Sequence, residues 1–419
     1  MLFDIFNYNV TLALFAFAFF LVLFLFLFRR YITSVADPLV FHVLWLTSQA
    51  AFFVIYAERN SVGIFYVIFV STLIMYVVSL LIFFPIYKRR KMAFISAVGS
   101  LPNLSVVRSK KHWGAIVALV FLMFLYSNIG FFEYALTCRS PAELFLYKYV
   151  DLQGRNPTER ILGVSSYFLL FFAFYGYHKK IHKRLAVFVI FIILMLAIVS
   201  GGRSALLGLV ASVGTYIFYF SHEFKSKTLK RINRISVFVI GLAVLLAVYV
   251  TSFYEVDGTF ENGLLLIFNR IFAAPDGIEY YLNHYGQDHI KMGPWAYFLS
   301  VFGIYVKNIF GLSYKNIGWQ LTELVGPDVE FSQGANYTVL LQAVVFNFYI
   351  APIYAVVVAW AVARLRYLYT VKLPVNVLVF VISSLSFIVA TDLEYFTLLL
   401  ISVVVVYVLG VATIARVRL

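Results

Sequence analysis

One arginine stands inside a long apolar stretch, in 200-SGGRSALLGL-209. Gly201 and Gly202 would let another group approach the backbone closely. If a helix begins at Arg203, its free N–H groups and the positive end of its dipole lie at that end, beside the arginine and the two glycines. A guanidinium beside a helix N-terminus is suited to bind an anion, above all a phosphate. Alternatively, Arg203 anchors the helix end at the membrane surface or caps the turn after Gly202.

A second arginine, Arg270, is the only charged residue in 264-LLLIFNRIFAA-274. An unpaired charge at membrane depth is costly, so this side chain is expected to face protein or a cavity. It could bind the same anion as Arg203, or form an ion pair with Asp276 or Glu279.

The elements that position these arginines must lie in a membrane. Of the 419 residues, 63% are hydrophobic and only 12% are charged, and the mean hydropathy is +0.92. A soluble protein of this length could not bury so much apolar surface, so the composition predicts an all-α, polytopic integral membrane protein. Windows of about 20 apolar residues predict about eleven spans. They are 8–28, 38–56, 62–86, 113–132, 161–177, 185–200, 204–220, 235–253, 339–361, 374–390 and 397–413.

The charges predict how these spans are oriented. If the N-terminus lies outside, 23 of the 33 basic residues fall on one side of the membrane, with only two acidic residues, Asp37 and Glu223. By the positive-inside rule that side is the cytoplasm, and the C-terminus lies there too. The net charge of +14 is therefore explained by the membrane and gives no reason to expect a nucleic-acid partner.

This topology places the candidate residues on the outer side. Arg184 and Lys225 both belong inside, so the chain crosses outward and returns between them, and Arg203 lies at the outer membrane face. We expect a single membrane domain, 1–419, with one large outer loop, 254–338, between spans 8 and 9. The loop contains two apolar pieces, 264–274 and 295–312, which we expect to be interfacial or re-entrant helices.

Only two of the seven histidines, His284 and His289, fall on the outer side in this topology. If an imidazole transfers a proton there, it belongs to one of these two, although both could be ordinary surface histidines. A carboxylate base is equally possible. The carboxylates considered for this role are Glu255, Asp257, Asp276, Asp288, Glu330 and Glu394.

Other outer residues are candidates for binding a substrate. Gln333, Asn336 and Thr338 could bind sugar hydroxyls or could cap the helix that follows. Gly202, Asp276 and Tyr280 complete the set of candidate substrate-binding residues. With one cysteine, Cys138, and no metal-ligand spacing of His, Asp or Glu, we expect neither a metal site nor a cofactor.

With these residues in view, the chain resembles the Wzy family of O-antigen and oligosaccharide repeat-unit polymerases over most of its length. The resemblance rests on about eleven spans, the turn 201-GGR-203, Arg270 in the long outer loop, 334-GANYT-338 and 346-FNFYIAP-352. Arg203 and Gly214 also fit a loose R-x10-G pattern found in some members.

The resemblance implies a metal-independent glycosyltransferase of GT-C-like fold in the bacterial inner membrane, with a large periplasmic loop, a periplasmic N-terminus and a cytoplasmic C-terminus. The growing glycan would move from undecaprenyl diphosphate to a sugar hydroxyl of an incoming lipid-linked repeat unit, on the periplasmic face. Arg203 and Arg270 would hold the diphosphate, and His284 or His289 would be the base. The partners implied are the lipid-linked oligosaccharide, as donor and acceptor, and the bilayer; a chain-length regulator protein is left open.

Three other functions fit parts of the sequence. A flippase for the same lipid-linked glycan would carry charges deep within several spans and often an internal repeat, whereas these spans are nearly free of charge. An O-antigen ligase would use the same donor with a lipid A core as acceptor, and the sequence does not separate it from a polymerase. A membrane-bound O-acyltransferase needs a histidine within a span, and only His42 comes close.

Overall fold

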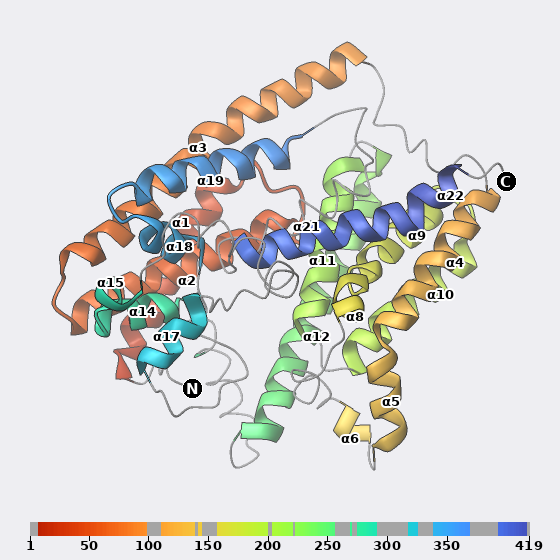
Figure 1. Ribbon diagram of the computed structural model, residues 1–419. Helices are drawn as coiled ribbons and strands as arrows, with labels where there is room; N and C mark the ends of the chain where they lie inside the picture. Colours follow the sequence, from red (N-terminus) through yellow and green to blue (C-terminus); the bar gives the residue numbers. More distant parts are fainter. Residues whose placement is uncertain are drawn as a thin grey trace.

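A computed structural model gives the architecture. It describes residues 7–98, 110–138, 141–144, 157–199, 203–220, 223–255, 269, 275–290, 317–325, 338–368 and 393–416. Among these residues every regular element is a helix and none is a strand, so the all-α prediction is confirmed for this part of the chain. Figure 1 shows the helices as long rods crossing the molecule, with short helices at its lower edge.

The first half of the chain contributes α1 (Val10–Phe28), α2 (Pro38–Arg59), α3 (Ile64–Val98), α4 (Lys110–Ser127), α5 (Ile129–Thr137), α6 (Pro141–Leu144), α8 (Pro157–Leu162), α9 (Ser165–His178), α10 (Lys183–Val199) and α11 (Arg203–Phe220). The second half contributes α12 (Ser226–Glu255), α14 (Asp276–Asn283), α15 (Gly286–His289), α17 (Ile317–Val325), α18 (Val339–Phe346), α19 (Ala351–Arg366), α21 (Leu393–Val406), the π-helical turn η4 (Tyr407–Ala412) and α22 (Thr413–Arg416).

In the described part of the chain, three helices are long and apolar enough to cross a membrane: α1, α2 and the Ile64–Met92 part of α3. A fourth candidate is the pair α4 and α5, which is bent by 50° at a short break. Exposed apolar side chains such as Phe15 and Val22 of α1 are what a surface against lipid tails requires. The described residues therefore contain three or four candidate spans in a membrane-type helical fold.

The predicted ninth span, 339–361, is two helices and not one. α18 ends at Phe346 and α19 begins at Ala351, with Asn347 as the C-cap of the first. Pro352 lies in the first turn of α19, where its missing N–H costs no helical hydrogen bond, whereas in a helix continuing from α18 its ring would clash with the carbonyl of Phe348. The break therefore comes from local sequence. Of the other predicted spans, 374–390 lies outside the described residues.

The long helices form two sets that meet at α2 and α11. In one set α1 packs along α2, and α19 packs along α3; in the other, α9 lies between α4 and α10, and α11 lies against α12. Figure 1 shows the first set on the left and the second on the right. α11 joins them because it also contacts α2.

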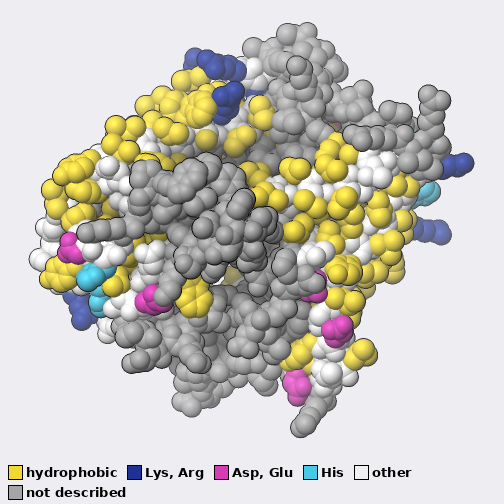
Figure 2. Space-filling view, in the orientation of Figure 1, with side chains coloured by type: hydrophobic (Ala, Val, Ile, Leu, Met, Phe, Trp, Pro, Cys, Tyr) yellow, Lys and Arg dark blue, Asp and Glu magenta, His cyan; other side chains and the backbone are white. Residues whose placement is uncertain are grey.

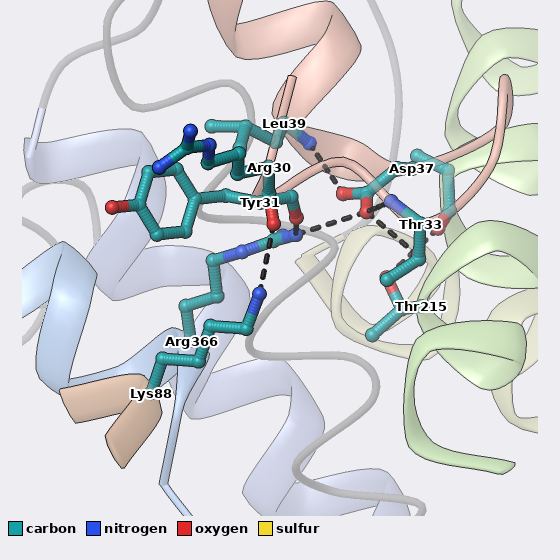
Figure 3. Close-up of polar contacts among 9 residues, drawn as sticks. Arg30, Tyr31, Thr33, Asp37, Leu39, Lys88, Thr215 and Arg366 are labelled. Atoms are coloured by element: carbon teal, nitrogen blue, oxygen red, sulfur yellow. Dashed lines mark hydrogen bonds and ion pairs between the residues drawn. The ribbon is translucent and has the colours of Figure 1, made fainter. Parts of the chain in front are cut away.

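A buried ion pair ties the start of α2 to the end of α19. The Arg366 guanidinium donates to Asp37 Oδ2 at 2.9 Å and to the carbonyl of Tyr31 at 2.8 Å. The side chains are 4% and 0% exposed. Asp37 also accepts hydrogen bonds from the backbone N–H and hydroxyl of Thr33 and, as the N-cap of α2, from the backbone N–H of Leu39. Figure 3 shows this carboxylate enclosed by its donors, with Thr215 of α11 nearby.

The glycine of the R-x10-G pattern has a packing role at this junction. A Cβ atom on Gly214 would lie 1.8 Å from the carbonyl oxygen of Ala36 and 2.8 Å from the backbone nitrogen of Asp37. Only a glycine lets α11 approach the backbone ahead of α2 this closely. Helix packing therefore explains why a glycine stands at position 214.

We expect the substitution Gly214→Ala to destabilise the protein by about 1–3 kcal/mol or more, because the clash is with backbone atoms that cannot rotate away. Thermal unfolding in detergent micelles measures the effect. The matched control is Gly241→Ala in α12, where an added Cβ meets nothing within 4 Å and the gain in helix propensity is about 0.5–1 kcal/mol. Equal melting temperatures for the two variants would contradict the packing role.

Candidate functional site

The helix ends assigned to the outer side by the charge pattern lie together in space. Aromatic contacts join Phe65, at the start of α3, to Tyr281 of α14 and to Phe348, between α18 and α19, at ring-centroid distances of 6.1 and 5.4 Å. Tyr56, near the end of α2, donates a hydrogen bond of 2.8 Å to Asn283 at the end of α14. α14 is thus held over the ends of α2 and α3, as its place below α1 and α2 in Figure 1 also shows.

Within this cluster the carboxyl group of Glu279 is the chemically notable side chain. Tyr8, just ahead of α1, donates its hydroxyl proton in a short hydrogen bond to Glu279 Oε1. The other oxygen, Oε2, is buried and accepts no hydrogen bond from the described part of the chain. Burying a charged carboxylate oxygen without a hydrogen bond costs free energy. Oε2 is therefore the atom at which this carboxyl group holds a proton or accepts one.

The surroundings set the proton affinity of Glu279. Burial raises the pKa of its carboxyl group, while the hydrogen bond from Tyr8 and the positive charge of Arg59 oppose that rise. The net direction is upward, so the folded protein favours the protonated carboxyl group more than an exposed glutamate does. Burial and the adjacent Glu279 also raise the pKa of the Tyr8 hydroxyl, which therefore stays a donor.

Arg59 completes the cluster from the end of α2. Its guanidinium donates a short hydrogen bond to the carbonyl of Asn7, and it lies over the Tyr8 ring at 5.5 Å from the centroid. Arg59 is exposed, so its remaining N–H groups face the outer surface. A cation at the rim and a carboxyl group beneath it together form a site that can bind a polar or anionic group and move a proton.

The candidate residues from the sequence are distributed around this cluster. Asp276 lies in the first turn of α14, and Tyr280 is buried in the same helix. His284 is the C-cap of α14 and His289 ends α15, and both side chains are exposed. Exposed imidazoles lack the enclosure that surrounds the Glu279 carboxyl group, so Glu279 is the better placed proton acceptor in the described part of the loop.

α11 is described from Arg203 onward, and the predicted turn before it, Gly201 and Gly202, lies outside the described residues. The side chain of Arg203 lies outside them too, as do Arg270, Gln333 and Asn336. The two apolar pieces of the outer loop, 264–274 and 295–312, lie outside them as well, apart from the buried Asn269. Thr338 caps α18 by accepting a hydrogen bond from the backbone N–H of Leu341, which is the capping role that the sequence allowed.

Sequence reasoning treated Glu279 only as an ion-pair partner and did not include it among the possible bases. The signal that marks it is not local, because its hydrogen-bond donor, Tyr8, precedes it by 271 residues. The amphipathic pattern of α14 offers a partial hint, since Gly277, Ile278, Tyr280 and Tyr281 are its buried residues and Glu279 lies among them.

Two further observations bear on the chemistry. Within the described residues no group of three or more His, Cys, Asp or Glu side chains is placed to hold a metal ion. His42, the one histidine that an acyltransferase could use, is buried in α2 and shares a hydrogen bond of 3.0 Å with Tyr76 of α3.

Comparison with family models, curated proteins and solved structures finds no match to this chain.

Proposed function

We propose that the protein polymerises undecaprenyl-diphosphate-linked oligosaccharide repeat units by block transfer of the growing glycan on the periplasmic face of a bacterial inner membrane. The observation that carries the proposal is the outer-side cluster around Glu279, where a buried carboxyl oxygen with no donor in the described part of the chain lies beside a cationic rim. The apolar helices and the charge bias of the eleven predicted spans support a multi-pass enzyme whose chemistry lies outside.

The reaction assigns roles to Glu279, Arg203 and Arg270. The acceptor sugar hydroxyl attacks the anomeric carbon of the donor glycan, and the bond from that carbon to the diphosphate oxygen breaks. Glu279 receives the hydroxyl proton on Oε2. Arg203 and Arg270 stabilise the charge that develops on the departing undecaprenyl diphosphate. In this scheme Glu279 replaces His284 and His289 as the proposed base.

Incubation of the purified protein with a lipid-linked repeat unit, followed by electrophoresis of the glycan, tests the proposal. A ladder of lengthening products is expected. Transfer to a lipid A core alone would identify a ligase, and unchanged substrate that has only moved between leaflets of a proteoliposome would identify a flippase. Either of these outcomes removes the polymerase assignment.

We expect Arg203→Ala to lower the initial rate of chain growth by roughly 10²-fold, since one pre-oriented donor to a developing anion typically contributes about 3 kcal/mol. The product of this variant would be mainly single repeat units. Arg184→Ala, at the opposite, cytoplasmic end of the same helical hairpin, is the control and should give the normal ladder. Normal chain length in the Arg203 variant would remove its assignment as a diphosphate ligand.

A further inference from the structure

A second polar surface lies where α1 ends and where the apolar part of α3, Ile64–Met92, ends, on the side that the charge pattern assigns to the cytoplasm. Five exposed basic side chains form it, and we refer to them as the α1–α3 basic surface: Arg29, Arg30, Lys88, Arg89 and Arg90. Figure 2 shows basic side chains gathered over α3 at the upper edge of the molecule, whereas acidic side chains lie in the lower half.

Specific contacts bring the two helix ends together. Lys88 Nζ donates a hydrogen bond of 2.8 Å to the carbonyl of Arg30 and lies 5.5 Å from the centroid of the Tyr31 ring. Below them, the rings of Phe28 and Phe84 meet edge to face at 5.9 Å. The surface is therefore a defined junction of two helices and not a chance accumulation of charge along one of them.

The charges of this surface are not neutralised within the described part of the chain. None of the five side chains forms an ion pair there, and the nearby carboxylate, Asp37, is bound by Arg366. Aromatic rings instead support two of the guanidinium groups, Arg29 over Phe26 at 4.3 Å and Arg90 over Tyr87 at 5.4 Å. Stacking on a ring face leaves the N–H groups at the guanidinium edge available to an oxyanion.

Apolar side chains continue from the basic surface toward the middle of the membrane. On α1 the side chain of Phe26 is 58% exposed, and on α3 that of Ile82 is 53% exposed. Val22 and Ile86 extend these two exposed flanks. A ligand that fits both parts has an anionic head and long hydrocarbon chains, which are the two parts of an acidic phospholipid.

We propose that the α1–α3 basic surface binds an anionic phospholipid with two phosphates, of the diphosphatidylglycerol class, whose acyl chains lie along α1 and α3. Arg29 and Arg30 directly follow α1, and Arg89 and Arg90 lie near the end of the apolar part of α3, Ile64–Met92, so each phosphate can accept hydrogen bonds from one arginine pair. Lys88, at the junction, adds charge to both sites. This inference uses residues outside the proposed catalytic site and stands independently of the proposed reaction.

The test is lipid binding to the purified full-length protein, measured by native mass spectrometry and by the melting temperature in detergent with added lipid. Diphosphatidylglycerol should bind and stabilise the wild type, and phosphatidylcholine should not. The variant R29Q/R30Q/R89Q/R90Q should bind diphosphatidylglycerol at least about tenfold more weakly, because each basic residue beside an anionic headgroup adds to the electrostatic attraction between protein and lipid. Lys88 is retained so that its hydrogen bond to the Arg30 carbonyl is kept.

The matched control, K183Q/R184Q/K227Q/K230Q, removes the same charge from exposed positions at the starts of α10 and α12. It should change lipid affinity by less than about twofold. Equal weakening in both variants would show general attraction to anionic lipid and would overturn the site, as would wild-type protein that does not distinguish the two lipids. Stabilisation by inorganic pyrophosphate to the same extent as by the lipid would also overturn it, because the acyl chains would then play no part.

Discussion

Replacing Arg366 by Gln should lower the free energy of unfolding by about 3–5 kcal/mol, one of the largest effects expected for a single substitution in this chain. The substitution leaves the buried Asp37 carboxylate without its guanidinium partner, and it removes a donor from the Tyr31 carbonyl. The side chain of Asp37 is fully buried, so water cannot replace the guanidinium without local unfolding. Thermal and denaturant unfolding in detergent micelles measure the loss.

Arg364→Gln is the matched control, because Arg364 is exposed on the same last turn of α19 and its guanidinium lies over the Trp360 ring. Its effect should stay within about 0.5 kcal/mol. Arg366→Lys should fall between the two, since an ammonium group is a point charge and lacks the planar fork that donates to Asp37 and Tyr31 together. A stability of the Arg366→Gln variant indistinguishable from that of Arg364→Gln would show that the ion pair does not hold these helices together.

Replacing Glu279 by Gln should reduce the turnover of polymerisation by about 10²–10⁴-fold, the usual contribution of a positioned base. The amide keeps the size of the side chain and an oxygen that accepts the hydrogen bond from Tyr8, but it cannot take up a proton at neutral pH. The Michaelis constant for the lipid-linked repeat unit should change little, because a base acts mainly in the transition state.

The control for this variant is Glu58→Gln, an exposed carboxylate one residue before Arg59, which should leave turnover unchanged. Tyr8→Phe separates catalysis from packing. The hydrogen bond from Tyr8 lowers the pKa of Glu279, so its loss should move the rise of activity with pH to higher pH. An unaltered pH profile for Tyr8→Phe, or full activity for Glu279→Gln, would exclude Glu279 as the base.

The raised pKa of Glu279 also affects stability. The folded state holds the proton more tightly than the unfolded chain, so the contribution of Glu279 to stability is greatest at low pH. It is lost as the pH rises through the folded-state pKa. Glu279→Gln should therefore flatten this part of the stability profile.

Much of the helical framework could be predicted from apolar windows, because a span needs only length and composition. The prediction of 8–28 corresponds to α1 at Val10–Phe28, and that of 204–220 corresponds to α11 at Arg203–Phe220. The break at Asn347 was missed since its flanks are both apolar, and a window of about 20 residues averages over one proline turn. The position of such a helix break depends on single residues such as Asn347 and Pro352 and not on the mean hydropathy of the window.

The site was harder to predict than the helices. Glu279 owes its burial and its hydrogen bond to Tyr8, far away in the chain, so no spacing within 254–338 identifies it. The exposed His284 and His289 have the more suggestive side chains but a less suitable environment.

The pairing of Asp37 with Arg366 has a consequence for how the protein is made. The two residues are 329 positions apart, and at a synthesis rate of about 5–20 residues per second the carboxylate waits roughly 15–65 s for its counter-ion. During that interval α1 and α2 have been synthesised, but Asp37 between them has no Arg366 to pair with. A ribosome that stalls before α19 thus leaves a chain in which Asp37, at the start of α2, has no Arg366 to pair with.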